Sequence, residues 1–519
     1  MNTQMKTFNS NTCRILFAAC LSALCMVAPS TRAATVTVIN TNDSGAGSLR
    51  QAIADSNDGD TIAFGVTGTI TLTTGELLVT KSISIAGPGS DQLTLDGNHA
   101  SRIFLVGDGP TVTIAGLTIT NGVANANSNG GGIINDSSTL TVRNCTISGN
   151  SAPSAWGLGG GIYNDVSFGN GRLEIINSTL SNNSAGDNGG GIYNYGGSRT
   201  ATLKVLNSTF SGNSAFFYGG GIFNISAYAG SAPADVLNST FSGNTAGRFG
   251  GGIYNNAFTG GTSPLAVFHS TFSDNSAFSG PSGGIANVSG TLQLGSTILN
   301  ASSLSNDSGT ITSLGYNLSS DNGGGFLTAT GDQSNTTPLL GPLQDNGGPT
   351  FTHALLTGSP AIDAGDPNFD PNAFNPPMLY DQRGSGHDRV ANSRIDIGAF
   401  EIVIPSYAGQ VQPPINADGS SNFNVRRGVV PVRFNLTLNG VATCDLPPAT
   451  IAVTRTAGGV IGQVNESDYS GNADTGSNFR INSCQYVYNL NARAIGVGTY
   501  RVDILINGQV VGSASFGLN

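Results

Sequence analysis

Short apolar stretches, separated by corners rich in glycine, asparagine and serine, recur through the middle of the chain. Stretches such as Leu173–Ile176 and Leu203–Leu206 have strand length and are bounded by turn-forming residues, which predicts short β-strands. No window of the sequence shows the sustained 3.6-residue periodicity of an amphipathic helix, so a helical solenoid is excluded. The middle of the chain is therefore predicted to consist of strands.

These strands belong to a repeat with a step of 29 to 32 residues. A Gly-Gly-Gly-Ile motif, weaker in its last copy, places isoleucines in phase at Ile133, Ile162, Ile192, Ile222, Ile253 and Ile285. A second motif, Asn-Ser-Thr-Leu-Ser-Asn-Asn-Ser-Ala at residues 177–185, recurs with variations at 144–152, 207–215, 238–246 and 269–277. A single unit cannot bury its apolar face, whereas stacked units can.

Stacking of such units predicts a right-handed parallel β-helix, in which equivalent strands pair about 4.8 Å apart. The isoleucines are expected to face inward. The corners use Gly and Asn because these residues tolerate left-handed backbone angles. Asparagines stacked on one another can form amide ladders. The predicted structural ladder consists of Asn150, Asn183, Asn213, Asn244 and Asn275.

The ends of such a stack need covers, because they expose strand edges and apolar core. Thr35–Val38 predicts a strand, and Ser48–Gln51 forms a capping box that opens a short helix. Residues 34–108 are thus expected to form the N-terminal cap and first coils, and residues 109–345 the repeats. Residues 346–403 lose the repeat and are expected to form the closing coil and cap.

Residues 404–519 show a different pattern. Apolar residues at every second position from Tyr500 to Ile506 precede Asn507-Gly508, a strong signal for a tight turn between antiparallel strands. Residues 430–436 predict another strand, placed at a sheet edge because it contains proline. The predicted fold class is all-β: a right-handed parallel β-helix followed by a small immunoglobulin-like β-sandwich.

Several of these segments resemble known families. Residues 35–64, with Asn-Asp-Ser-Gly-Ala-Gly-Ser-Leu-Arg-Gln-Ala-Ile at 42–53, resemble the start of bacterial secreted β-helix proteins of the CSLREA and choice-of-anchor Q type. Residues 346–401 resemble the choice-of-anchor Q region itself. The Gly-Gly-Ile and Phe-Ser-Gly-Asn motifs are similar to polymorphic outer-membrane protein repeats. Pro431–Phe434 resembles the PxKF type of C-terminal domain, with Arg in place of Lys. The resemblance implies architecture and export, and it carries over no catalytic residue.

Composition and the N-terminus point to an exported, ordered protein. Only 10% of residues are charged, 38% are hydrophobic and the net charge is −10, which disfavours nucleic acid and anionic membrane surfaces as partners. Lys6 and Arg14 precede an apolar run at 15–28, which predicts a signal peptide over residues 1–33. The run is too short for a lasting span, so no transmembrane segment is expected after cleavage. The expected location is secreted, extracellular or at the cell surface.

The cysteines fit that location. Cys13, Cys20 and Cys25 lie in the predicted signal peptide. An oxidising compartment favours a disulfide between Cys444 and Cys484, which leaves Cys145 as a lone, buried thiol.

The sequence predicts no catalytic set. The acidic residues of the repeats do not line up as a set in repeat phase, although Asp136 and Asp165 both follow the asparagine of their motif: Asp136, Asp165, Glu174, Asp187, Asp235 and Asp274. Residues 280–284 match the G-x-S-x-G sequence pattern of a nucleophile elbow, but no helix is predicted after them, and the elbow requires a turn between a strand and a helix. In one loop, Asp363, Asp366 and Asp370 offer oxygen ligands for Ca²⁺, although Asp also simply makes turns. No other cofactor is expected.

Aromatic residues follow the repeat isoleucines at Tyr163, Tyr193, Phe223 and Tyr254. If the isoleucines point inward, these four side chains form an outward stripe. Such a stripe can stack on sugar rings, or it can be packing that shields the sheet.

Three functional hypotheses follow. The first is an adhesin-like protein that binds carbohydrate or another cell-surface component without catalysis. The second is a polysaccharide lyase or glycoside hydrolase, which would need carboxylates converging on one face. The third is a structural spacer of the cell envelope, which would bind no ligand.

Overall fold

The computed structural model describes residues 33–107, 109–125, 129–280, 282–392, 394–403, 405–464 and 473–519. The chain forms two compact units, Met1–Ile402 and Val403–Asn519. The predicted signal peptide, with Cys13, Cys20 and Cys25, lies outside the described residues except for its last position. Within the described residues, no helix is both long and apolar enough to cross a membrane.

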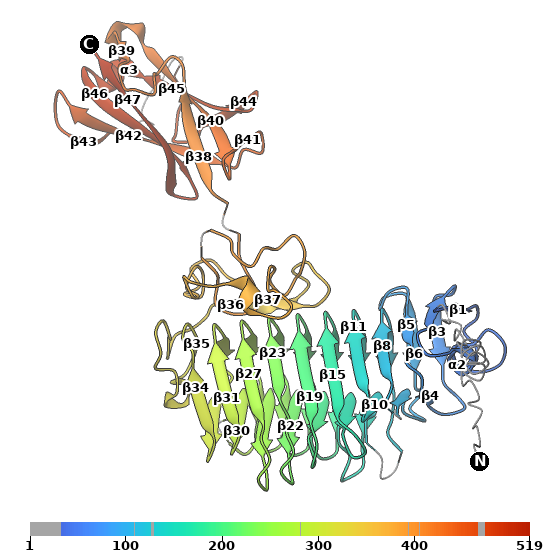
Figure 1. Ribbon diagram of the computed structural model, residues 1–519. Helices are drawn as coiled ribbons and strands as arrows, with labels where there is room; N and C mark the ends of the chain where they lie inside the picture. Colours follow the sequence, from blue (N-terminus) through green and yellow to red (C-terminus); the bar gives the residue numbers. More distant parts are fainter. Residues whose placement is uncertain are drawn as a thin grey trace, which may run out of the picture. The chain divides into compact units, whose positions relative to one another are not determined.

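The first unit is a right-handed parallel β-helix with four parallel sheets, named A to D here (Figure 1). Sheet A has eleven strands: β1 (Thr35–Val38), β2 (Thr61–Phe64), β5 (Ser84–Ala86), β8 (Thr111–Ala115), β11 (Thr139–Arg143), β15 (Gly171–Ile176), β19 (Ala201–Leu206), β23 (Ala234–Leu237), β27 (Pro264–Phe268), β31 (Thr291–Gly295) and β34 (Thr310–Ser313). Sheet B has ten: β3 (Gly68–Thr71), β6 (Leu93–Asp96), β9 (Thr118–Thr120), β12 (Thr146–Ser148), β16 (Thr179–Ser181), β20 (Thr209–Ser211), β24 (Thr240–Ser242), β28 (Thr271–Ser273), β32 (Ile298–Asn300) and β35 (Leu318–Ser319).

Sheet C carries the Gly-Gly-Gly-Ile motifs and has nine strands: β4 (Leu77–Val79), β7 (Phe104–Val106), β10 (Ile133–Asp136), β14 (Ile162–Asp165), β18 (Ile192–Tyr195), β22 (Ile222–Ser226), β26 (Ile253–Ala257), β30 (Ile285–Val288) and β33 (Leu304–Asp307). Sheet D is short and has five: β13 (Ser151–Ala152), β17 (Ser184–Ala185), β21 (Ser214–Ala215), β25 (Thr245–Ala246) and β29 (Ser276–Ala277). Successive coils thus contribute strands to sheets A, B and C in turn, and the five coils from β13 to β29 also contribute one to sheet D.

The repeat fixes the strand register. Ile162 pairs with Ile192 and Leu180 with Phe210, and these residues are fully buried. Along sheet B the rings of Phe210, Phe241 and Phe272 stack with centroids 4.7 Å apart, which is one strand spacing. Like side chains therefore fill the interior in columns along the helix axis.

The predicted asparagine ladder runs through the corner between sheets B and D. Its members are all buried: Asn150, Asn183, Asn213, Asn244 and Asn275. The side-chain amides of the first four donate to the side-chain oxygen of the asparagine in the next coil over 2.8–3.0 Å, and that of Asn275 donates to the Ser302 hydroxyl at 3.2 Å. A second ladder, absent from the sequence predictions, follows sheet C over Asn135, Asn164, Asn194, Asn224, Asn255, Asn287 and Asn306.

The N-terminal end is covered by α2 (Leu49–Asp55), as its capping box suggests. Ser48 is the N-cap, and its hydroxyl accepts from the Gln51 N–H at 3.2 Å. Leu49, Ala52 and Ile53 are buried in the main core.

Residues 346–403, expected to form the closing coil and cap, instead lie mostly in a segment on the flank of the helix, residues 338–402, which is named the side segment here. The side segment contains β36 (Leu340–Gln344), β37 (Thr352–Leu355) and η2 (Pro371–Ala373), and it lies along the flank of the helix (Figure 1). It covers an outward column of sheet B formed by Thr209, Thr240, Thr271, Ile298 and Leu318. The last coil is covered instead by the residues after η1 (Gly323–Gly325), where Phe326 and Leu327 join the main core. Ile298 and Leu318 at the end of this column would otherwise be exposed apolar side chains, which explains why a cover is needed there.

The second unit consists of two sheets around their own core. One contains β38 (Tyr407–Gln412), β40 (Val429–Leu438), β41 (Val441–Thr443), β44 (Arg480–Asn482) and β45 (Gln485–Asn491). The other contains β39 (Asn422–Phe423), β42 (Ala449–Ala457), β43 (Gly462–Val464), β46 (Gly498–Ile506) and β47 (Gln509–Leu518). The short helices are η3 (Val425–Arg427) and α3 (Ala492–Ile495). The small β-sandwich predicted for this region is the fold observed.

Two details of this unit concern specific predictions. Strand β40, expected at an edge, lies between β38 and β45. Its Pro431 is tolerated because β38 pairs only with Arg433–Leu438, so the side facing β38 is open at the proline. Cys444 and Cys484 form a disulfide, and Cys145 is a buried free thiol in the first unit.

Candidate functional site

The predicted aromatic stripe points outward from sheet C but is not exposed. Neighbouring rings lie 4.9–5.4 Å apart, and the exposed fractions are 4–8%: Tyr163, Tyr193, Phe223 and Tyr254. Leu158 and Tyr218, from the loops that precede the glycine motifs, pack against these rings. Burial raises the pKa of Tyr254 to about 12. The stripe is therefore a second apolar cluster, and its interpretation as a sugar-stacking surface is corrected.

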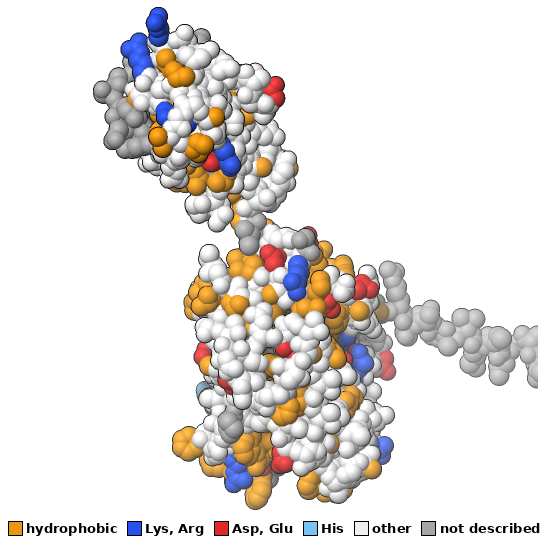
Figure 2. Space-filling model, turned by 90° about the vertical axis from the view of Figure 1, so that its left-hand side faces the viewer, with side chains coloured by type: hydrophobic (Ala, Val, Ile, Leu, Met, Phe, Trp, Pro, Cys, Tyr) orange, Lys and Arg blue, Asp and Glu red, His pale blue; other side chains and the backbone are white. Residues whose placement is uncertain are grey.

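Exposed aromatic side chains gather instead on the loops that follow sheet D. Phe216 is 66% and Phe278 94% exposed, and Phe249 is partly exposed. The guanidinium carbon of Arg248 lies 4.7 Å from the centroid of Phe217. Figure 2 shows protruding hydrophobic side chains, with basic ones beside them, along the lower edge of the first unit. The aromatic and basic residues of the loops that follow sheet D are named the aromatic ridge: Phe216, Phe217, Arg248, Phe249 and Phe278.

The ridge is held by backbone hydrogen bonds between coils. Gly247 N–H donates to Ala215 O at 3.1 Å, and Phe278 N–H donates to Ala246 O at 3.0 Å. Phe216, Gly247 and Phe278 consequently occupy the same position of three successive coils. Phe216 and Phe278 lie two strand spacings apart, about 9.6 Å. Between them the glycine leaves a hollow of about 380 Å³.

The glycine is required at the middle position. A Cβ on Gly247 would lie 1.9 Å from the carbonyl oxygen of Phe216, so any side chain there would clash with backbone. The sequence signal for the ridge is the residue directly after each Ser-Ala or Thr-Ala of the second motif. It is Pro153, Gly186, Phe216, Gly247 and Phe278 in successive coils.

A charged row, which repeat phase did not reveal, lies on the outward face of sheet A. Glu174 pairs with Lys204, and Lys204 with Asp235. Arg172 donates from Nε to Glu174 Oε1 at 3.2 Å, and burial raises the pKa of Asp235. Asp235 also lines a hollow of about 450 Å³ over β23–β34. The expectation that the charges do not line up is therefore corrected.

The row was not predicted because the loops before sheet A differ in length. Positions counted from the glycine motif are therefore shifted in some coils. The strands themselves pair in register: Leu173–Ile176, Leu203–Leu206 and Ala234–Leu237. A further pair, Asp136 and Asp165, is in register on β10 and β14 of sheet C.

The three Ca²⁺ candidates do not converge. Asp366 accepts from the Asn368 N–H and Asp370 from the Asn372 N–H, both at 2.9 Å, as turn-forming aspartates do. Among the described residues, no three His, Cys, Asp or Glu side chains are grouped to hold a metal ion.

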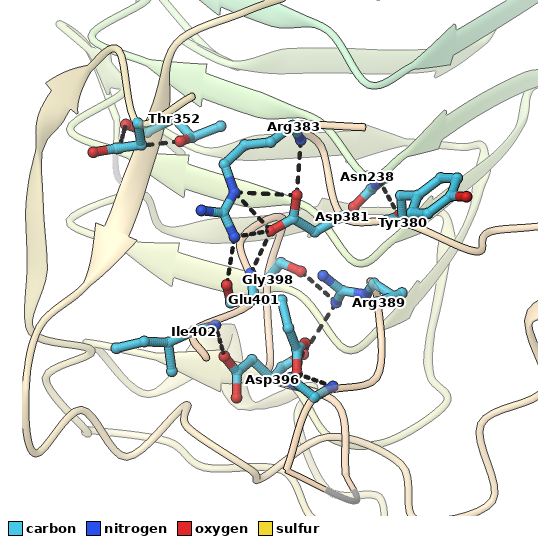
Figure 3. Close-up of polar contacts among 12 residues, drawn as sticks. Asn238, Thr352, Tyr380, Asp381, Arg383, Arg389, Asp396, Gly398, Glu401 and Ile402 are labelled. Atoms are coloured by element: carbon cyan, nitrogen blue, oxygen red, sulfur yellow. Dashed lines mark hydrogen bonds and ion pairs between the residues drawn. The ribbon is translucent and has the colours of Figure 1, made fainter. Parts of the chain in front are cut away.

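A buried polar network ties the side segment together (Figure 3). Arg383 Nη2 donates to Asp381 Oδ2 at 2.6 Å and to the Glu401 carbonyl oxygen at 2.6 Å. Arg389 Nη2 donates to the carbonyl oxygen of Gly398 at 2.6 Å and to Nδ1 of His269 at 3.2 Å. His269 occupies the position of the first asparagine of the second repeat motif, and it is thus joined to the side segment.

The network contains carboxyl groups with shifted acidity. Burial raises the pKa of Glu401 to about 8 and that of Asp396 to about 6. Two backbone N–H groups donate to Glu401, from Ala391 and Asp396. Glu401 and Arg389 are at most 1% exposed, so this network serves the packing of the segment rather than contact with a ligand.

Comparison with known proteins supports the architecture. A family model described as the right handed beta helix region matches residues 80–246, which is less than half of the chain. No curated protein matches the chain.

Proposed function

We propose that this chain is a secreted or cell-surface, adhesin-like protein that binds carbohydrate through its aromatic ridge without catalysis. The observation that carries the proposal is the hollow between Phe216 and Phe278. The backbones of the two residues lie about 9.6 Å apart, and their exposed phenyl rings border the hollow and offer aromatic surface on which the C–H faces of a pyranose ring can stack.

The ridge has the features of a preformed binding surface. Its backbone is fixed by hydrogen bonds to the neighbouring coils, so little ordering is required on binding. Arg248 adds N–H donors for hydroxyl or carboxylate oxygens and is itself oriented by Tyr218, whose hydroxyl accepts from Arg248 Nη1 at 3.2 Å. The N-terminal residues resemble a signal peptide, and the Cys444–Cys484 disulfide is typical of proteins in oxidising compartments outside the cytoplasm. Both features support export.

A glycan array with residues 34–519 tests the proposal, with release of reducing ends assayed on every glycan that binds. We expect binding without release. We expect the Phe216→Ala/Phe278→Ala variant to lose at least ten-fold in affinity. The matched control is Phe168→Ala/Phe258→Ala, which removes two exposed phenyl rings from loops between sheets C and A. Equal losses in both variants would contradict a specific role of the ridge.

One observation favours a second candidate, a glycoside hydrolase or polysaccharide lyase. Glu174 and Asp235 flank Lys204 on the outward face of sheet A, about 9.6 Å apart at the backbone. Two carboxyl groups that converge on one face are the set that an inverting glycosidase needs. New reducing ends in the same assay, abolished by Glu174→Gln or Asp235→Asn, would establish this activity.

A further inference from the structure

A cleft of about 280 Å³ lies at the seam between the side segment and the helix. Its walls include Phe268, Leu314 and Tyr316 from the coils, and Asp366, Asp370 and Phe374 from the side segment. This seam cleft is separate in sequence and in lining from the aromatic ridge.

The cleft exists because an apolar column is interrupted. Along sheet A the outward residues Leu206, Leu237 and Phe268 follow one another, and Gly295 comes next. Met378 of the side segment packs on Leu206 and Leu237. Gly295 interrupts the column between Phe268 and Leu314, and a Cβ on Gly295 would meet the Phe268 ring at 2.9 Å. The covering loop therefore spans a hollow instead of a packed surface.

The aromatic walls are fixed. Phe374 lies edge-on to Phe268 and His269, with centroid distances of 5.9 and 5.4 Å. Tyr316 lies against Gly331, where a Cβ would approach its ring to 2.2 Å, and Arg394 lies 5.6 Å from its centroid. The rings are thus preorganised rather than free to collapse into the cleft.

The polar side chains of the cleft are two carboxylates and several neutral groups, which include Ser296, Tyr316 and Asn368. The lining contains two carboxylates, Asp366 and Asp370, and no lysine or arginine. His269 also lines it. Its Nδ1 is engaged by Arg389, and its Nε2 makes no hydrogen bond to a described residue. Burial and the Arg389 charge lower its pKa, so its ring is neutral and carries its proton on Nε2.

We infer that the seam cleft is a second carbohydrate site, for a single pyranose ring without an acidic group. Aromatic walls suit the C–H faces of the ring, and carboxylates accept from its hydroxyl groups. The two negative charges disfavour uronic acids and sulfated sugars. The inference deepens the proposed carbohydrate binding by adding a site that the ridge does not share.

Saturation-transfer NMR on residues 34–519 tests the inference, with the methyl pyranosides of glucose, galactose and mannose and with N-acetylglucosamine and glucuronate as probes. Leu314 is half-exposed at the lip of the cleft, so Leu314→Trp plugs it without disturbing the core, while Leu314→Ala leaves it open. We expect at least one neutral sugar to give a signal that falls at least ten-fold in Leu314→Trp and persists in Leu314→Ala.

The ridge variant Phe216→Ala/Phe278→Ala separates the two sites. The inference holds if this variant keeps the monosaccharide signal. It is overturned if no neutral sugar gives a signal, if Leu314→Trp keeps the signal, or if glucuronate binds as well as the neutral sugars. If the signal is lost only in the ridge variant, the inferred sugar site in the seam cleft is refuted, whereas the proposed carbohydrate binding at the ridge is retained.

Discussion

Thr240 donates a hydrogen bond of 2.6 Å from its hydroxyl to the side-chain oxygen of Gln382, although the two residues lie 142 positions apart in the chain. The amide nitrogen of Gln382 donates to the hydroxyls of Thr209 at 2.8 Å and Thr350 at 2.9 Å. One fully buried side chain thus joins the side segment to two coils of sheet B.

Replacing this glutamine should loosen the side segment. Gln382→Ala leaves the buried Thr240 hydroxyl without its acceptor and removes the hydrogen bonds to Thr209 and Thr350, and we expect a loss of about 2–4 kcal/mol in the free energy of unfolding. Chemical denaturation measures the loss, and limited proteolysis should cut first within residues 338–402. Gln293→Ala, at an exposed glutamine of sheet A, is the control. An unchanged denaturation midpoint in Gln382→Ala would contradict the conclusion that Gln382 stabilises the contact between the side segment and sheet B.

The asparagine ladder should be as important as the apolar core. Asn213 accepts from both the backbone and the side-chain amides of Asn183, and it donates to Leu180 O and Asn244 Oδ1. Asn213→Ala leaves these buried groups unpaired, and we expect a destabilisation of about 2–4 kcal/mol. Ser181→Ala, at a half-buried outward position of β16, should change stability by less than about 0.5 kcal/mol. Equal effects would argue against the ladder.

The buried stripe should affect stability rather than binding. Tyr193 is 7% exposed between Tyr163 and Phe223, so Tyr193→Ala should destabilise by about 3–5 kcal/mol through the cavity that it leaves. Tyr193→Phe keeps the ring, and we expect glycan binding to be unchanged. Binding lost in Tyr193→Phe with stability intact would restore the stripe as a ligand surface.

The acidity of Glu401 predicts how stability depends on pH. Its folded pKa, about 8, lies above the value near 4.5 expected for the unfolded chain, so folding favours the protonated form. The stabilisation is complete below pH 4.5 and is lost as pH rises to about 8. We expect the melting temperature of the first unit to fall between pH 5 and 8.5. Glu401→Gln, which has no charge to lose, should flatten this decline; an equally steep decline would assign it to other groups.

Much of the β-helix follows from sequence because its contacts are periodic. A step of about 30 residues places Ile162 over Ile133 and Asn183 over Asn150, so register, core and ladder all follow from one alignment. The position of the side segment does not follow, because its contacts pair residues more than 100 positions apart without any repeat, as Gln382 and Thr209 show.

The surfaces were harder to predict than the core for a related reason. Whether an outward residue is exposed depends on the loops that cover it. Tyr193 and Phe278 are both outward aromatic residues, yet loops bury the first and leave the second open. Loop lengths vary between coils, so the repeat gives no direct information on which outward column is covered.

The central claim is that the ridge binds sugar, and the most direct test is calorimetric titration of residues 34–519 with the oligosaccharide that binds best on the array. We predict that Phe216→Ala/Phe278→Ala weakens the affinity at least ten-fold, while Phe168→Ala/Phe258→Ala stays within two-fold of the unmodified chain. Unchanged affinity in the ridge variant, with the fold intact by circular dichroism, would contradict the account.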